Sequence, residues 1–322
     1  MAPLRNLADA RSALGLQEEK LRARAGFYRA YARNLENGRA RQSEGDVWAR
    51  LARPAEPWAG PAVIASSYRM AAQYAALFDP LLAAVLMMRA SRAYLDAGAA
   101  FGLFLAAGAL SDDALLAAGA DRELSGLSTP SRNRNATVAT DPVQQAYLLL
   151  AVAARPALRE HFSGDLSALL SRLAAYGLEP VGSQGVPLEQ YLGIAQVLLE
   201  YEPPVGLHPS RSFVDEIAAR LAVISRAHAD VLHTGQRNSY LWQNEAAALN
   251  IVDLGQTALF NLAAGPGLLR SEPVLDRVGE LTEDDPFAQL TALTAQETAQ
   301  AAPFITELAV RILRHQDNQQ EG

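Results

Sequence analysis

The sequence predicts an all-α protein, built as an array of antiparallel helical hairpins in a solenoid or a bundle. Alanine makes up about a fifth of the 322 residues, whereas aromatic residues make up 7%. This composition favours helices, because alanine has the highest helix propensity and sheets are rich in β-branched and aromatic residues. Amphipathic patterns of helical period recur along the chain, and alternating strand-like segments joined by hairpin turns do not.

The first predicted element is a long amphipathic helix over residues 16–36, which Gly38 ends. Residues at helical spacing form its buried stripe: Leu21, Ala25, Tyr28, Ala32 and Leu35. Its other faces carry charged residues of both signs: Arg22, Arg24, Arg29, Arg33, Glu18, Glu19 and Glu36. Such a mixture is typical of a solvated face, and the alternative is a basic surface that faces RNA or a membrane.

Turn residues divide the next part of the chain, of which 61–110 is the most apolar stretch. These turn signals are Pro54, Pro57, Pro61, Asp79–Pro80, Gly98 and the N-cap sequence Ser111-Asp112-Asp113. Over residues 124–140, Ser, Thr, Asn, Arg and Gly replace the apolar pattern, which predicts a mobile loop or linker. The chain is therefore expected to divide into an N-terminal helical region, 1–123, and a C-terminal helical region, 141–322.

The C-terminal region begins with Asp141–Pro142, an N-cap residue followed by a proline in the first turn of a helix. Further helices are predicted over residues 164–176, 187–201, 212–234, 239–262, 286–298 and 302–315.

One helical pair has the spacing of a known repeat. Its matching positions are Met70, Ala71 and Tyr74 on the first helix, Asp79–Pro80 at the turn, and Ala83, Met87 and Ala90 on the second helix. Residues 67–98 thereby resemble one tetratricopeptide unit, in which small residues let two helices approach closely. Ser67 and Leu95 replace that family's Trp and Pro, and no second copy follows. The resemblance implies a helical hairpin and a concave face on which asparagines hold peptides.

Composition excludes several kinds of chemistry. The chain has no cysteine and a single lysine, Lys20, so thiolate metal sites and lysine-based catalysis are not expected. Its net charge of −7 disfavours nucleic acid, and no uncharged run reaches the roughly 18–20 residues that span a bilayer. Because the N-terminus lacks the apolar core of a signal peptide, we expect a cytoplasmic protein. The excess of Arg over Lys indicates a GC-rich, bacterial genome.

The residues that most often hold metals lack the spacing to do so. His228 and His233 lie five helical positions apart, or about 140° around the helix. His228 continues an apolar row and is predicted to be a core histidine; the row comprises Ile217, Leu221, Ile224 and Val231. Asp112–Asp113 and Asp284–Asp285 lack the further acid of the magnesium motifs in terpene synthases, and both are predicted to cap helices. We expect no metal and no cofactor.

Two polar stripes are the candidate binding residues. A stripe of neutral amides and hydroxyls with one carboxylate follows helix 239–262, and it includes Gln243, Asn250, Asp253, Thr257 and Asn261. Side-chain amides both donate and accept hydrogen bonds, as an extended peptide requires of its host. A second stripe on the preceding helix consists of Arg226, Asp230, His233 and Arg237. The alternatives are a solvated face or a hydrogen-bonded seam between helices for the first stripe, and exposed ion pairs on a solvated face for the second.

These observations predict a non-enzymatic module, a regulator or adaptor, that binds a protein or peptide partner in a helical groove. An enzyme on an all-helical scaffold, acting on a hydrophobic or isoprenoid substrate, is the second hypothesis. A structural homo-oligomer is the third.

Overall fold

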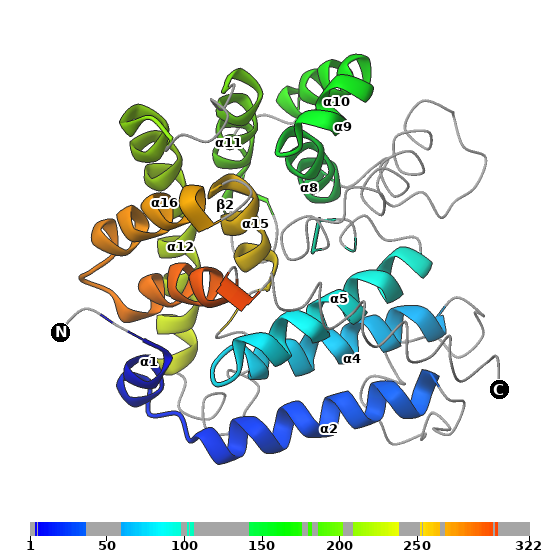
Figure 1. The fold of residues 1–322 in the computed structure, drawn as a ribbon, viewed down its shortest axis with the longest axis vertical. Coiled ribbons are helices and arrows are strands. Elements are labelled where there is room, and N and C mark those ends of the chain that lie inside the picture. Colours follow the sequence, from blue (N-terminus) through cyan, green and yellow to red (C-terminus); the bar gives the residue numbers. More distant parts are fainter. Residues whose placement is uncertain are drawn as a thin grey trace.

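A computed structural model describes most of the two helical regions and is shown in Figure 1. The described residues are 4, 6–36, 59–97, 102, 104–105, 142–175, 180–181, 186–201, 209–237, 252, 254–264, 268–298 and 300–301. Helices dominate this part of the chain, and a short antiparallel pairing of β1 (Pro180–Val181) with β2 (Val186–Pro187) accompanies them. The prediction of an all-α fold is confirmed.

The N-terminal helices are α1 (Leu7–Ala13), α2 (Glu18–Glu36), α4 (Ala59–Ala75) and α5 (Pro80–Asp96). Helices α2, α4 and α5 lie side by side as a layer, and the short helix α1 lies at one end of it (Figure 1). Helix α2 packs on α4, and α4 packs on α5. The predicted stripe of α2 faces α4, since Leu21, Ala25 and Ala32 are buried and Tyr28 and Leu35 are half-buried.

The turn between α4 and α5 follows from its sequence. The carboxylate of Asp79 accepts a hydrogen bond from the Leu82 amide at 3.0 Å, which satisfies one of the unpaired donors at the start of α5. Pro80 occupies the first turn, where its missing N–H costs nothing. Ala71 and Tyr74 on α4 and Ala83, Met87 and Ala90 on α5 are all buried.

The C-terminal helices surround α15, which lies near the centre of the view in Figure 1 and contacts α4, α8, α12 and α16. The helices of this region are α8 (Pro142–Ala153), α9 (Pro156–His161), α10 (Ser163–Ala174), α11 (Leu188–Glu200), α12 (Arg211–Arg237), α15 (Leu254–Ala264) and α16 (Leu268–Leu281). Residues 286–298 form a further helix. The predictions over 164–176, 187–201, 212–234 and 286–298 agree with these bounds to within a few residues.

Long-range hydrogen bonds connect the two helical regions. The amide of Leu4 donates to Gln289 Oε1 at 3.0 Å, and Gln73 Nε2 donates to the carbonyl of Val252 at 3.0 Å. One cluster of buried apolar side chains also includes residues of both regions. The division at residues 124–140 stays a prediction, because that loop lies outside the described residues.

Several other predictions concern residues that the structure does not describe: Pro54, Pro57, Gly38, Gly98, Ser111-Asp112-Asp113, Asp141 and the helix over 302–315. Within the described part of the chain, none of the helices combines the length and apolar character that crossing a bilayer requires.

Candidate functional site on helix α12

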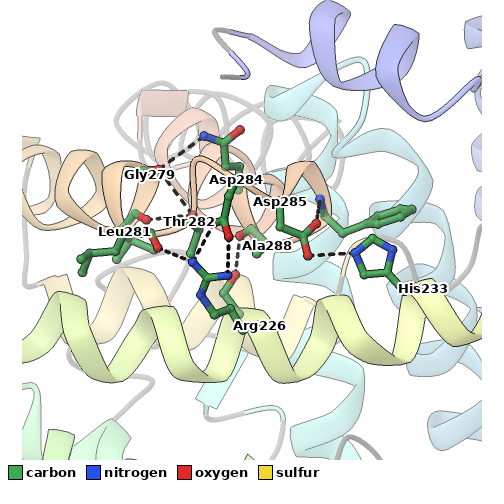
Figure 2. A network of polar contacts seen from close by, with 12 residues as sticks. Arg226, His233, Gly279, Leu281, Thr282, Asp284, Asp285 and Ala288 are labelled. Carbon is green, nitrogen blue, oxygen red and sulfur yellow. Dashed lines mark hydrogen bonds and ion pairs between the residues drawn. The ribbon is translucent and has the colours of Figure 1, made fainter. Parts of the chain in front are cut away.

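Two residues of the predicted charged stripe reach from α12 to the turn that follows α16 (Figure 2). Arg226 Nη2 contacts Asp284 Oδ1 at 2.7 Å and donates to the carbonyl of Leu281 at 2.7 Å. His233 Nε2 lies 2.8 Å from Asp285 Oδ2. We call Arg226, His233, Asp284 and Asp285 the α12 clamp, because together they fix this turn against α12.

Asp285 also begins the next helix. Its Oδ1 accepts a hydrogen bond from the Phe287 amide at 3.0 Å, while its backbone carbonyl accepts from the Gln289 amide at 3.0 Å. One carboxylate therefore caps helix 286–298 through one oxygen and contacts His233 through the other. The capping role predicted for Asp284–Asp285 is confirmed at Asp285.

Neighbouring contacts hold the clamp residues in place. The ring of His233 meets the ring of Phe287 edge-on, with centroids 4.9 Å apart. The hydroxyl of Thr282 donates to the Val278 carbonyl at 2.8 Å, and the hydroxyl of Ser225 donates to the Ala288 carbonyl. These bonds occupy polar groups in and beside the turn and join it to α12 and α16, although Asp284 itself is exposed.

The electrostatics of the clamp follow from its hydrogen bonds. The hydrogen bond from Arg226 lowers the pKa of Asp284 below its ordinary value. The same bond raises the pKa of Arg226. Both groups are therefore charged at neutral pH, and their attraction adds to the geometric role of the contact.

The solvated-face alternative expected exposed side chains paired along the helix; Arg226 and Asp230 are exposed, and only the pairing differs. Arg226 and His233 instead bond residues of the following turn, 58 and 52 positions away in sequence. Asp230, which lies between them on α12, is exposed. Arg237 is the last residue of α12, and its side chain is outside the described part.

The amide stripe is only partly described, and its described members point inward. Thr257 on α15 has 0% exposure, so it does not line a groove open to solvent. Asn261 is half-buried, and its side-chain oxygen and nitrogen have no solvent contact and no hydrogen-bond partner among the described residues. Burial of Thr257 contradicts a solvated face at that position, and Asn261, without a hydrogen bond among the described residues, does not fit a hydrogen-bonded seam. Gln243, Asn250 and Asp253 lie outside the described residues.

Helix α12 also presents apolar side chains that the sequence pattern misassigned. His228 is buried, as predicted for a core histidine, and so are Ile217, Leu221 and Ile224 of its row. Val231, which the same row placed in the core, is 41% exposed, and Val223 is 43% exposed. Together with half-buried Ala227, they recur every fourth residue and form one outward stripe. We call Val223, Ala227 and Val231 the α12 stripe.

The described residues offer no arrangement for metal chemistry, since no group of three or more His, Cys, Asp or Glu side chains among them is placed to hold an ion. What α12 presents is an apolar stripe beside charged groups whose positions are fixed by hydrogen bonds. In comparisons with known proteins, no family model, no curated protein and no solved structure matches the chain.

Proposed function

We propose that this protein is a non-enzymatic interaction module of the regulator or adaptor type, and that it binds a peptide or protein partner along the outward face of α12. The observation that carries the proposal is the α12 stripe, with Val223 and Val231 left 43% and 41% exposed on a helix whose opposite side is buried. Apolar side chains aligned on one face provide the kind of surface on which amphipathic segments dock.

The α12 clamp makes this surface suitable for recognition. Arg226 and His233 lie on the same side of α12 as exposed Asp230, next to the stripe, and both are held by hydrogen bonds. A partner that contacts side chains already fixed in place loses less conformational entropy on binding than one that must order them. Asp230 supplies a carboxylate at the edge of the stripe.

The remainder of the fold is consistent with such a module. Helices α4 and α5 follow one another through the capped turn at Asp79–Pro80 and bury alanines between them. We extend this arrangement to an array of antiparallel hairpins of tetratricopeptide-like geometry, in which α12 supplies the binding face.

The proposal is tested by selecting binders from a displayed library of random peptides. Selected peptides are measured on the wild-type protein and on Val223→Glu/Val231→Glu, which places two carboxylates on the stripe. Leu81→Glu is the matched control, because Leu81 is a similarly exposed apolar residue (39%) on α5. Melting curves establish that each variant is folded.

We expect the selected peptides to bind wild type and Leu81→Glu alike and to lose at least tenfold in affinity on the double variant, or about 1.4 kcal/mol. If no peptide is enriched, or if the enriched peptides bind the double variant as well as wild type, the α12 stripe is not the binding face.

A further inference from the structure

A second surface, on α2, has a different character from the α12 stripe. Phe27 is 58% exposed, the highest value among the exposed large apolar residues of the described chain. The inner side of α2 is occupied by its contact with α4, so Phe27 projects from the opposite side of the helix. Its ring is held by an edge-on contact with the ring of Tyr28, at a centroid distance of 5.2 Å.

Two arginines without an ion pair among the described residues lie across the outward face of α2 from this ring, on its other flank. Arg29 and Arg33 are exposed and one helical turn apart, and neither has an ion pair or hydrogen bond among the described residues. The carboxylates expected to balance them are engaged elsewhere. Glu18 contacts Arg11 and Arg22 at 2.7 and 2.8 Å.

Glu36 is likewise occupied. It accepts a hydrogen bond from the Tyr68 hydroxyl at 2.6 Å and lies 3.8 Å from Arg89. Glu19 remains exposed, but it stands two turns before Phe27. The expected neutralisation of the α2 arginines therefore applies to Arg22 and not to Arg29 or Arg33.

The residues that lie between the ring and these arginines on the helix surface have small side chains. Ala23 and Ala30 are exposed, and a methyl group added at Gly26 would meet no atom within 4 Å. A partner helix has room to lie against the α2 backbone there, with an apolar side chain on Phe27 and carboxylates near the two guanidinium groups.

We propose that the outward face of α2 binds an acidic amphipathic helix of a partner protein. Charge complementarity selects this partner, because Arg29 and Arg33 offer donors that a carboxylate pair at i and i+4 satisfies.

Other occupants fit this face less well. A second copy of the chain would place its own Arg29 and Arg33 against these arginines, and like charges repel. An anionic membrane surface calls for more apolar side chains than a single phenylalanine among alanines. RNA is disfavoured by the net charge of −7. This site is independent of the α12 stripe.

The experiment uses two synthetic amphipathic helical peptides that share a central leucine. One carries glutamates at i and i+4 beside the leucine, and the other carries lysines there. Both are titrated against the full chain, against Phe27→Ala and against Arg29→Glu/Arg33→Glu. Arg172→Glu/Arg211→Glu is the matched control, since it changes the net charge equally on two other helices, α10 and α12.

The acidic peptide should bind wild type and the control alike, lose at least tenfold in affinity on Phe27→Ala, and lose more on Arg29→Glu/Arg33→Glu. The lysine peptide should gain affinity for Arg29→Glu/Arg33→Glu, because the charge pattern is then reversed on both sides. Equal binding of the acidic peptide to all variants overturns the proposal. It is also overturned if only vesicles of anionic phosphatidylglycerol, or only single-stranded RNA, bind in an Arg29-dependent manner.

Discussion

The contact between α4 and α5 buries a row of alanines and a methionine beside its polar bonds, whereas α12 and the turn after α16 are joined through an arginine, a histidine and two carboxylates. Helices α4 and α5 pack on one another, and Ala71 on α4 and Ala83, Met87 and Ala90 on α5 are fully buried. Between α12 and the turn, Arg226 and His233 reach to Asp284 and Asp285. The first contact gains free energy from burial of apolar area, and the second mainly fixes geometry, because partly exposed ion pairs contribute little net stability.

This difference indicates which property of the protein a substitution at each contact should change. Substitutions between α4 and α5 should change the stability of the whole protein. Substitutions in the α12 clamp should change stability less and act more on the start of helix 286–298 and on the neighbouring surface.

The largest expected effect is at Met87. Met87→Ala removes a fully buried side chain and should lower the free energy of unfolding by about 2–5 kcal/mol, because it leaves a cavity between α4 and α5. Met88→Ala is the matched control, since Met88 is the next residue and is only partly buried. Urea unfolding of both variants measures the difference. Equal losses would show that the contact between α4 and α5 does not depend on this packing.

A smaller effect is expected at Asp285. Asp285→Ala removes the helix cap and the partner of His233 and should cost about 1–3 kcal/mol. Asp285→Asn retains an oxygen that can cap the helix, so it should recover most of this loss. Asp284→Ala, on the exposed neighbouring carboxylate, should have a smaller effect than Asp285→Ala. If Asp284→Ala is the more destabilising variant, the ion pair rather than the cap holds the turn.

Asn261 gives the next test, with the opposite sign. Its buried amide has no hydrogen-bond partner in the described part of the chain, and an unpaired buried polar group costs about 1–3 kcal/mol. Asn261→Leu should therefore leave the melting temperature unchanged or raise it. A marked fall would show that the amide has a partner in solution, such as a bound water, and that α15 relies on it.

The last prediction concerns Tyr74, whose contribution to stability should differ from that of phenylalanine only at alkaline pH. Burial raises the pKa of Tyr74 to about 12, and the adjacent ring of Tyr28, stacked at 6.0 Å, contributes in the same direction. In the unfolded chain Tyr74 ionises near its ordinary value of 10. The unfolded state therefore loses its proton first as the pH rises, so Tyr74 stabilises the fold fully below pH 10 and progressively less between pH 10 and 12.

Tyr74→Phe should match wild type at pH 8 and lose less stability than wild type between pH 8 and pH 11. The urea midpoint of both proteins at the two pH values measures this. Parallel losses in the two proteins would show that Tyr74 does not carry the alkaline dependence.

The helices were predictable because their signals are local. The stripe of α2 and the turn at Asp79–Pro80 depend on residues within a few positions of one another, where helix geometry and capping chemistry act. The buried core position of His228 was predictable for the same reason, because it continues a helical row.

The partners of the α12 clamp were not predictable from one sequence. The charged stripe and the Asp284–Asp285 pair were each recognisable, but nothing local joins residues 52 and 58 positions apart. The exposure of Thr257 was also predicted incorrectly. A hydroxyl on the polar side of an amphipathic pattern is typical of a solvent-exposed face, but this one is buried. Val231 was incorrectly assigned to the core. Helical spacing identifies which residues lie in one row, but it does not say how much of each residue neighbouring elements cover. The exposure of Phe27 was predictable from the sequence, because this aromatic residue does not fall on the buried stripe of its helix.

The hydrogen bond from the Leu4 amide to Gln289 has a consequence for synthesis of the chain. These residues are 285 positions apart, so at about 5–20 residues per second the ribosome needs roughly 15–60 s to supply the acceptor after the donor. Throughout that interval the N-terminal segment lacks this partner. The contact is consequently among the last that a growing chain can form, and a nascent protein interrupted before residue 289 cannot make this hydrogen bond.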